Sequence, residues 1–469
     1  MQSGTPHQPG SIGRGRFTMS DDSAKLSMPL TIPSPSLVLL IGASGSGKST
    51  FARQHFLPTE VISSDTCRGL VSDDESDQEA SADAFDVLHD IAAKRLKRGL
   101  LTVIDATNVQ RNARSELLRL ARDYHVLPIA IVFNLPEPLL RQRNALRPER
   151  DVGPYVIRRQ VDAHRQSLRE LGREGFHSVH VLSSLEEVEA ATIVRQRLWV
   201  DRRDDHGPFD IIGDIHGCFD ELLELLGTLG YEVVVVPGEN GEERYDVRPP
   251  TGRTAIFLGD LTDRGPNSVG VLRLVMDMVV AGTALCLPGN HDDKLLRKLK
   301  GRNVRVAHGL AGTLEQLDRE PPAFRERVAT FLDGLASHYV LDHGKLVVAH
   351  AGLKEEYHGR ASKTVRDFAL YGDVTGKTDE EGFPIRRNWA ADYRGTATVV
   401  YGHTVVATPE WLNYTINIDT GCVFGGSLTA LRYPDRELVS VPAKIIHYGD
   451  GTKLLKLTQP SDSKGVILG

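Results

Sequence analysis

Short apolar runs recur along the chain, and most of them end in glycine or in polar residues. In the first half, these runs alternate with stretches whose apolar residues follow the helical period of about 3.6 residues. We predict strands at 36–41, 60–63, 101–104 and 127–133, and helices at 81–98 and 112–124. Strands that alternate with helices are typical of a parallel sheet in an α/β fold.

The second half has a similar strand pattern with different polar residues at the strand ends. Five apolar runs each lead into a polar cluster, at 209–212, 254–258, 284–287, 345–348 and 398–400. Two later segments, 413–419 and 427–433, alternate in polarity and contain β-formers, which favours antiparallel strands. We find no internal repeat, so the two halves are expected to be different domains.

Changes in composition predict the domain boundaries. Residues 1–35 are rich in Gly, Ser and Pro and have no apolar segment after a basic start, which predicts a disordered tail rather than a signal peptide. A closing helix is predicted at 185–203, and 204–208 has the composition of a linker. We therefore expect a first domain at 36–203, a second domain at 209–445 and a C-terminal tail at 446–469.

Composition also narrows the class of protein. No apolar run is long enough to span a membrane, and the four cysteines form no CxxC pair, so we expect neither a disulfide framework nor a zinc site. These features favour the cytoplasm. The chain has 56 basic and 62 acidic residues, a net charge of −6, which gives no overall sign of a nucleic-acid binder. One stretch, 141–173, has nine arginines against four acids and is either a solvated helix face or a local anion site.

A phosphate-binding motif follows the first predicted strand. Residues 42–49 match the G-x-x-x-x-G-K-[ST] pattern between an apolar strand and a helix. In such a loop, glycines let backbone N–H groups surround the phosphates, and the helix N-terminus adds partial positive charge. Lys48 is expected to reach the β and γ phosphates of a nucleotide, and Ser49 to ligate Mg²⁺. The predicted nucleotide-binding residues are Gly42, Gly45, Ser46, Gly47, Lys48, Ser49 and Thr50.

Two strand ends offer carboxylates close to this loop. Asp65 follows the strand at 60–63, with Arg68 three residues further on. A kinase that phosphorylates a hydroxyl needs a positioned base, so Asp65 is the candidate base and Arg68 the candidate clamp on an acceptor phosphate. The alternative is that Asp65 caps a helix. Asp105, at the end of the strand at 101–104, is either a Mg²⁺-water partner or part of a turn.

Three arginines of the basic stretch predict a lid over the loop. Arg143, Arg147 and Arg150 are four and three residues apart, which places them on one face of a helix. Arginine side chains stabilise the charge that spreads over phosphate oxygens during transfer. We predict that Arg147 acts in catalysis and that Arg143 and Arg150 contact the substrate. Pro148 interrupts the helix and makes the position of Arg150 less regular.

Five polar blocks in the second half predict a metal centre: GDIHG, GDLTDRG, GNHD, HAG and GHT. Their Asp, His and Asn side chains suit Mn²⁺, Fe or Ni²⁺. Two ions about 4 Å apart need a shared carboxylate, and together they activate a water and hold phosphate oxygens. We assign Asp260 as the bridge, Asp214 and His216 to one ion, and Asn290, His350 and His403 to the other.

Residues beside these ligands have candidate roles of their own. His291 is next to a ligand without being one, which suits a general acid for the leaving oxygen. Asp263 could orient it, and Arg264 could hold the phosphate. Asp419 follows an alternating strand and either supports a ligand from behind or ends the strand in a turn.

The order of the motifs resembles one family. Residues 36 to about 445 resemble the kinase and phosphatase domains of bacterial polynucleotide kinase–phosphatase, an RNA end-healing enzyme, in having a P-loop, SSDxxR, RNxxRPxR and then the five blocks on one chain. The blocks alone are shared with other binuclear phosphatases, including protein serine/threonine phosphatases and dinucleoside tetraphosphatases. The resemblance implies an α/β P-loop kinase domain, a parallel sheet with flanking helices, followed by a calcineurin-like binuclear metallophosphoesterase domain, a β-sandwich flanked by helices.

The resemblance also implies an activity. The first domain would use ATP and Mg²⁺ to phosphorylate 5′-OH polynucleotide ends, in RNA before DNA. The second would use two cations such as Mn²⁺ to remove 2′,3′-cyclic, 2′- or 3′-phosphates. The family's third module, a nucleotidyltransferase that seals ends, has no counterpart in the roughly 25 residues after 445. We therefore expect either a truncated chain or a separate ligase as a partner.

Two rival hypotheses remain at this point. In one, a small-molecule P-loop kinase is fused to a protein serine/threonine phosphatase or a dinucleoside tetraphosphatase. In the other, the P-loop is a nucleotide sensor that controls the phosphatase and transfers nothing. Label transfer from ATP to 5′-OH oligonucleotides tests the first rival, and Asp65→Ala tests the second, because a sensor would keep its control of the phosphatase.

Overall fold

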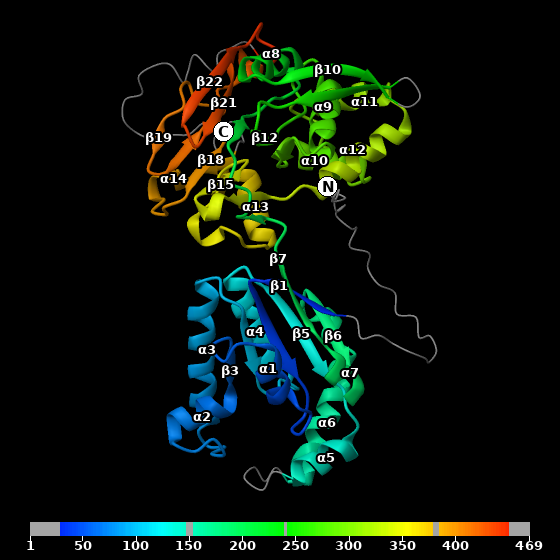
Figure 1. The fold of residues 1–469 in the computed structure, drawn as a ribbon, viewed down its shortest axis with the longest axis vertical. Helices are drawn as coiled ribbons and strands as arrows, with labels where there is room; N and C mark the ends of the chain where they lie inside the picture. The colour runs from blue at the N-terminus through cyan, green and yellow to red at the C-terminus, as the bar shows by residue number, and fades with distance from the viewer. Residues whose placement is uncertain (1–28, 147–152, 239–241, 379–383, 450–469) are drawn as a thin grey trace. The chain divides into compact units, whose positions relative to one another are not determined.

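The computed structural model describes residues 29–146, 153–238, 242–378 and 384–449. Contacts divide the described chain into two compact units. The first unit runs from 29 to 198 and takes in 360–362, and the second unit contains the other described residues. Figure 1 labels the elements of both units along the chain. Among the described residues, no helix has the length and apolar character needed to cross a membrane.

A parallel sheet of five strands forms the centre of the first unit (Figure 1). The strand order is β3-β4-β2-β5-β6, and all neighbours pair in parallel. The strands are β2 (Ser36–Ile41), β3 (Val61–Ser63), β4 (Thr102–Asp105), β5 (Leu127–Phe133) and β6 (Ser178–Leu182). The four strands predicted in this half are confirmed, and β6 is an additional strand.

Helices cover both faces of this sheet because successive residues of a strand point to opposite sides. Leu37 and Leu39 of β2 belong to one buried cluster, with residues of α3 (Ser81–Lys97) and α4 (Arg111–Asp123). Val38 and Leu40 belong to another, with Phe51 of α1 (Lys48–His55). The other helical segments are α2 (Ser64–Ser72), α5 (Glu137–Ala145), α6 (Pro154–Leu168), η1 (Leu171–Arg173) and α7 (Leu185–Ala190).

Two predictions at the edges of this unit are wrong. The segment 185–203 is not one helix, because α7 ends at Ala190 and two strands follow, β7 (Ile193–Arg197) and, in the second unit, β8 (Asp201–Arg202). β7 pairs in parallel with β1 (Leu30–Ser34), which lies inside the region predicted to be a disordered tail. Ile32 of β1 is fully buried. The segment that follows α7 forms a strand because it pairs with β1, which is distant in sequence. This pairing overrides the local helix propensity and cannot be predicted from the pattern within 185–203.

Two mixed sheets form the centre of the second unit. Their strand orders are β13-β12-β9-β21-β22 and β19-β20-β18-β15-β14-β8. As predicted, β21 is antiparallel to its neighbours, whereas β20 is antiparallel to β19 and parallel to β18. The strands not yet given are β9 (Phe209–Ile212), β12 (Thr254–Phe257), β13 (Ala284–Cys286), β14 (His338–Leu341), β15 (Leu346–Ala349), β18 (Thr398–Tyr401), β19 (Trp411–Leu412), β20 (Thr415–Asn417), β21 (Ser427–Tyr433) and β22 (Glu437–Pro442).

Helices and two hairpins complete the second unit. The α-helices are α8 (Phe219–Leu229), α9 (Ser268–Val280), α10 (Asn290–Leu299), α11 (Leu310–Asp318), α12 (Pro322–Gly334), α13 (Lys363–Tyr371) and α14 (Trp389–Asp392). The short 3₁₀ segments are η3 (Asp342–Gly344), η4 (Glu355–Tyr357) and η5 (Cys422–Phe424). The hairpins pair β10 (Glu232–Pro237) with β11 (Glu243–Arg248), and β16 (Val374–Thr378) with β17 (Pro384–Arg386).

The second unit extends beyond residue 445, where the sequence placed its end. His447 Nε2 lies 2.8 Å from Glu221 Oε1 of α8, and the N–H of Tyr448 donates to the carbonyl of Val423 at 2.9 Å. The described part of the predicted C-terminal tail, up to residue 449, is therefore packed against this unit.

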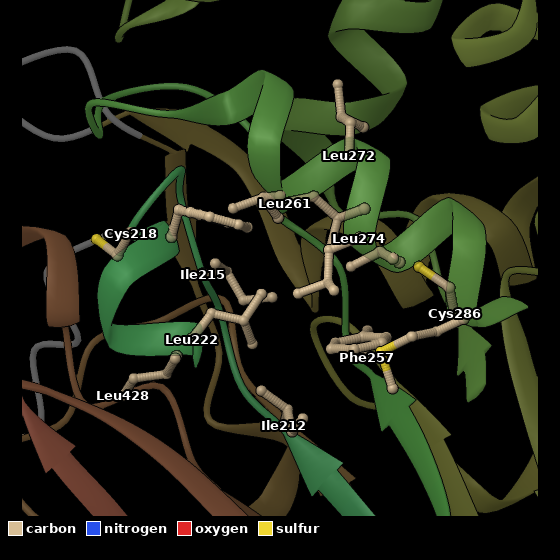
Figure 2. Close-up of a cluster of buried hydrophobic side chains, with 14 of the residues drawn as sticks. Ile212, Ile215, Cys218, Leu222, Phe257, Leu261, Leu272, Leu274, Cys286 and Leu428 are labelled. Atoms are coloured by element: carbon tan, nitrogen blue, oxygen red, sulfur yellow. The ribbon is translucent and has the colours of Figure 1, made fainter. Parts of the chain in front are cut away.

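The largest buried cluster of the second unit anchors the loops after β9 and β12. Figure 2 shows Ile215 and Leu261 among its side chains, together with Ile212 and Phe257 from the two strands. All four side chains are fully buried. Ile215 and Leu261 stand between polar residues of their loops, so the burial of each, worth about 1.5–3 kcal/mol, fixes the backbone that carries those polar groups.

Candidate functional sites

The P-loop of the first unit has the backbone that its glycines allow. Gly45 and Gly47 have φ angles of 82° and 93°, a left-handed region in which a side chain is strained. Lys48 is buried, and its Nζ donates to the carbonyl oxygens of Gly42 and Ala43 at 2.8 and 3.1 Å. The lysine is therefore already held at the loop that would surround a nucleotide's phosphates.

A pocket of about 430 Å³ adjoins this loop. Its lining includes Lys48 and Ser49 of α1, Asp65 of α2 and Asp105 at the end of β4. Thr50, the last of the predicted nucleotide-binding residues, is exposed and does not line the pocket. One cavity thus holds the lysine, the hydroxyl and both strand-end carboxylates that the sequence singled out.

Asp65 does not cap its helix, so one of the two alternatives for this residue is excluded. The cap is Ser63, whose Oγ accepts hydrogen bonds from the N–H groups of Asp65 and Thr66 at 3.2 and 3.5 Å. The Asp65 carboxylate instead forms an ion pair with Arg68. Arg68 Nε also donates to the carbonyl of Glu75 at 2.9 Å. In this arrangement, Arg68 holds Asp65, and its contact with an acceptor phosphate stays a prediction.

Helices α5 and α6 approach the P-loop. A Cβ added to Gly47 would lie 3.4 Å from an Nη1 atom of Arg143, so this arginine lies against the loop. From α6, Gln160 Oε1 accepts a hydrogen bond from a backbone N–H of the loop at 2.8 Å. Gln160 stands in no sequence motif, so it was not predicted. The other arginines of the predicted lid, Arg147 and Arg150, lie outside the described residues.

In the second unit, the predicted metal ligands all stand just after a strand. Most of these strands are neighbours in their sheets, so their ends can meet at one edge. Asp214 and His216 follow β9, Asp260 follows β12, Asn290 begins α10 after β13, and His350 and His403 follow β15 and β18.

Asp260 stands between two groups of histidines. Its Oδ2 lies 3.4 Å from Nε2 of His216 and 3.6 Å from Nε2 of His350. His216, Asp260 and His291 form one group of potential metal ligands, and Asp260, His350 and His403 form another. Within each group the candidate ligand atoms lie within 4.8 Å of one another. Asp260 is the carboxylate that the two groups share, which is the position required of a bridge between two ions.

Asn290 and Asp214 extend the second group. Asn290 Oδ1 lies 3.1 Å from His350 Nε2, which is also 3.1 Å from His403 Nδ1. Asp214 Oδ1 is 3.9 Å from His350 Nδ1, and its Oδ2 accepts a hydrogen bond from the N–H of His403 at 3.1 Å. Asp214 therefore lies beside His350 and His403, and its assignment to the same ion as His216 stays a prediction.

Buried atoms without partners test whether the centre suits cations. Among the described side chains, Asp214 Oδ1 and His403 Nε2 are buried and have no hydrogen-bond partner. An unpaired buried polar atom costs about 1–3 kcal/mol, and a divalent cation bound to either atom would remove that cost. The residues present therefore fit a divalent metal centre, with carboxylate, imidazole and amide ligands.

The pKa shifts of these ligands point the same way. Burial, followed by the charges of Asp419 and Asp260, raises the pKa of Asp214. Burial lowers the pKa of both His216 and His403. The histidines are thus held in the neutral form that binds metals, while the crowded carboxylates repel one another until a cation lies between them.

His291 is held by a short chain of hydrogen bonds. Its Nδ1 lies 2.7 Å from Asp263 Oδ2, and Thr313 Oγ1 donates to the other carboxylate oxygen of Asp263 at 2.7 Å. This leaves Nε2 as the ring nitrogen for proton transfer. Arg264 Nη1 lies 2.7 Å from His216 Nε2, so its guanidinium is beside the predicted metal ligands.

Three further residues support the centre. Asp419 Oδ1 accepts from the N–H of Gly421 at 3.0 Å, which closes the turn, and its charge adds to burial in raising the pKa of Asp214; its support of a metal ligand stays a prediction. Asp292, inside the GNHD block but without a predicted role, accepts from backbone N–H groups on both sides of the centre. Arg386 contributes, after burial, to the lowered pKa values of the histidines after β15 and β18. Arg386 stands in no motif and was therefore not predicted.

Two protein families match the chain. Residues 37–171 match the family described as AAA domain, and residues 207–407 match the family described as calcineurin-like phosphoesterase. The chain thus combines a kinase-like P-loop domain, which implies nucleotide binding, with a metallophosphoesterase domain, which implies divalent metal ions.

Individual relatives match the second half. The asymmetrical bis(5′-nucleosyl)-tetraphosphatase PrpE of Anoxybacillus flavithermus is 48% identical over 239 residues, which are 50% of this chain and 94% of the relative. PrpE of Halalkalibacterium halodurans is 48% identical over 240 residues, with the same coverage of 50% and 94%. A crystal structure provisionally assigned as a diadenosine tetraphosphatase is 28% identical, covers 52% of this chain and 97% of its own, and has a TM-score of 0.38.

Proposed function

We propose that this chain, which belongs to the calcineurin-like phosphoesterase family through its second half, heals nucleic-acid ends. The proposal is supported by the order of its motifs and by the kinase-like P-loop domain that precedes the phosphoesterase domain. The first unit would transfer the γ-phosphate of ATP, with Mg²⁺, to a 5′-OH end. The second unit would remove 2′,3′-cyclic, 2′- or 3′-phosphates with two divalent cations, for which Mn²⁺ is our proposed identity. RNA ends are the proposed substrate ahead of DNA ends, and a separate ligase is the proposed partner that seals them.

One observation carries the transfer reaction: Lys48 and Asp65 line the same pocket of about 430 Å³. The pocket offers space for a nucleotide's phosphates at Lys48 and Ser49 and for an acceptor hydroxyl beside Asp65. Asp65 would take the proton of that hydroxyl as its oxygen attacks the γ-phosphorus and ADP leaves. Arg143, which lies against the loop, would stabilise the charge on the transferred group. Positioning and charge stabilisation are most of what this reaction needs from a protein.

In the second unit, bound cations would neutralise phosphate oxygens and lower the pKa of the attacking water. Arg264 would hold a further phosphate oxygen. His291, whose Nδ1 is fixed by Asp263 at 2.7 Å, would protonate the leaving oxygen from Nε2 in its imidazolium form, and the Asp263 carboxylate would stabilise that form. The ligands would be Asp214, His216, Asp260, Asn290, His350 and His403.

A cleaved RNA hairpin with 5′-OH and 2′,3′-cyclic phosphate ends tests the proposal. After incubation with ATP, Mg²⁺ and Mn²⁺, we expect 5′-phosphate and 3′-OH termini. Lys48→Ala should lose only the 5′ reaction and Asp260→Asn only the 3′ reaction, so each variant is the control for the other. Unchanged termini with the wild-type protein would overturn the proposal. Phosphatase control by ATP that survives Asp65→Ala, with no label transfer by the wild type, would favour the nucleotide sensor instead.

The relatives favour a second candidate, hydrolysis of a dinucleoside tetraphosphate by the second unit. The two PrpE proteins carry that activity in their names and are 48% identical to this half. Comparing kcat/KM for diadenosine tetraphosphate with that for a 3′-phosphorylated oligonucleotide separates the candidates. A value for the dinucleotide that is larger by a factor of ten or more would favour this second function.

A further inference from the structure

A run of positive charge begins one turn after the metal ligand that opens α10. Between residues 294 and 308 there are six lysines and arginines and no acidic residue, in a chain whose net charge is −6. The six are Lys294, Arg297, Lys298, Lys300, Arg302 and Arg305. Neither the metal centre nor the phosphate clamp accounts for this run. A concentration of one sign of charge beside a site raises the local concentration of ligands of the opposite sign.

One residue of this run, Lys294, lies on the helix that carries the candidate acid and holds the end of the following loop. Lys294 is three residues after His291 in α10, which places both on one face of the helix. Lys294 Nζ donates to the carbonyl of Ala307 at 2.9 Å, and this bond brings the end of the 300–309 loop, with Arg305 and His308, back to α10. The loop also contacts Arg264, the proposed phosphate clamp: a Cβ added to Gly309 would collide with the backbone nitrogen of Arg264.

The charged groups around Lys294 and His308 affect one another's pKa values. The pKa of Lys294 is lowered by burial; the charge of Asp263 opposes this shift, and the smaller effects of Arg264 and Arg305 add to it. The pKa of His308 is lowered by burial and then by Lys294 and Arg264, among others. These groups therefore lie near enough to repel, and an anion among them would relieve the repulsion.

The acidic groups of the same region have other partners as well. Asp263, whose charge also acts on Lys294, accepts a hydrogen bond from Thr313 and pairs with His291. Asp293, the residue before Lys294, pairs with Arg366 at 2.9 Å. Because Asp263 is shared with His291, the positive charge of Lys294 and Arg305 is only partly compensated and can attract an incoming anion.

We propose that Lys294 and Arg305 bind a second phosphate of the substrate, next to the phosphate that is cleaved. This inference rests on the proposed function and specifies its substrate class: the preferred substrates carry at least two phosphates in series. The shared chemistry is a phosphodiester or phosphoanhydride chain, from a polynucleotide 3′ end or from a dinucleoside polyphosphate. A phosphoprotein with a single phosphate would make no use of this subsite.

The test compares Lys294→Ala and Arg305→Ala with Lys345→Ala as the matched control. Lys345 is 69% exposed and precedes β15, whose other end leads to His350, so it lies roughly 16 Å from the centre at about 3.3 Å per residue. Substrates are diadenosine tetraphosphate, an oligonucleotide with a 3′-phosphate, and p-nitrophenyl phosphate, which has one phosphate. Arg305→Ala guards against a folding effect in Lys294→Ala, since the side chain of Arg305 is exposed.

We expect each of the two variants to raise KM about tenfold for the substrates with several phosphates, as for the loss of one charge-assisted hydrogen bond. The effect on p-nitrophenyl phosphate should be at least threefold smaller. The two long substrates distinguish the two sources of the phosphate chain. Equal effects on all three substrates, or no effect on any, would overturn the inference.

A second arm needs no natural substrate. Tripolyphosphate and orthophosphate, with Mn²⁺ in excess, compete against p-nitrophenyl phosphate, and we expect tripolyphosphate to inhibit the wild type at least ten times more strongly. Both variants should shrink that ratio to threefold or less, and Lys345→Ala should keep it. If nucleotide substrates fail but the ratio holds, the proposed function is wrong and the subsite stands. If nucleotides are turned over and the ratio is one, the subsite is wrong and the function stands.

Discussion

Replacing Asp260 by asparagine changes one atom of the metal centre and removes the charge shared by its two halves. The carboxylate lies 3.4 Å from the nearest nitrogen of His216 and 3.6 Å from that of His350. Its other oxygen accepts the N–H of His291 at 2.9 Å, and the amide oxygen of asparagine can keep that bond. The fold should therefore survive, while neither ion keeps its bridging ligand.

The expected loss of activity is large. Charge stabilisation by the two ions is worth several kcal/mol in the transition state, and a loss of about 4 kcal/mol corresponds to a fall of about 10³ in kcat. Metal binding should weaken as well. At a concentration of 100 Kd, one ion stabilises the folded state by about 2.7 kcal/mol, so the metal-dependent rise of Tm should shrink or vanish in the variant.

The assay combines p-nitrophenyl phosphate hydrolysis, bound metal measured by mass spectrometry of the ions, and thermal unfolding with and without Mn²⁺. Asp220→Asn, an exposed carboxylate in the first turn of α8, is the matched control and should behave like the wild type. Kinase activity of the same samples reports on the first unit. Two ions per chain together with near wild-type hydrolysis in Asp260→Asn would refute the assignment of Asp260 as the bridge.

Four further outcomes follow from single side chains. Lys48→Ala should abolish ATP binding by equilibrium dialysis and spare phosphate release by the second unit; retained binding would contradict its role. Asp65→Asn should lower label transfer by about 10²–10⁴ with ATP still bound, and a near-normal rate would exclude it as the base. Gly402→Ala places a Cβ against Asp214 Oδ1, so metal affinity should fall by tenfold or more, measured by Mn²⁺ titration. The pKa of His338 is lowered from 6.5 to about 3 by burial and then by a neighbouring histidine. Below about pH 6.5 the unfolded chain therefore binds a proton at His338 that the folded chain does not bind. The free energy of unfolding should then decrease by about 1.4 kcal/mol for each unit by which the pH falls below about 6.5. His338→Asn should remove about 2 kcal/mol of that fall between pH 6.5 and 5 in urea unfolding, and an unchanged slope would argue against a neutral His338.

The parts of the fold that follow a local rule were predictable. A buried parallel strand is a short apolar run, and β2 and β5 begin and end at the residues predicted. The helix α3 differs from its predicted limits by one residue at its C-terminus, and α4 by one residue at each end, because the helical period is a local property. β7 and β1 were missed because each is a strand only through the other, and their pairing is set by residues far apart in sequence.

The candidate site residues divide in the same way, into those predictable from the local sequence and those set by distant contacts. Asp260 and the histidines after β15 and β18 could be listed from their place at strand ends, since strands that are neighbours in a sheet bring their ends together. Arg386 and Gln160 could not, because neither stands in a motif and each reaches its site from a separate element. The contact of Cys218 and Cys422 with Glu221 was also not predicted, because the two cysteines are far apart in sequence. One candidate ligand atom from each of these three residues lies within 4.8 Å of the others.

By itself, the sequence determined which functional groups this protein contains and which strand or loop carries each of them. A glycine that needs a positive φ, a lysine after it and an aspartate at a strand end are properties of a few consecutive residues. Only the tertiary structure decided which of these groups share a site: that Lys48, Asp65 and Asp105 line one pocket, and that Asp260 belongs to both histidine groups. Such distances depend on how whole strands and helices pack, and burial, which shifts the pKa of Asp214, exists only once that packing is complete.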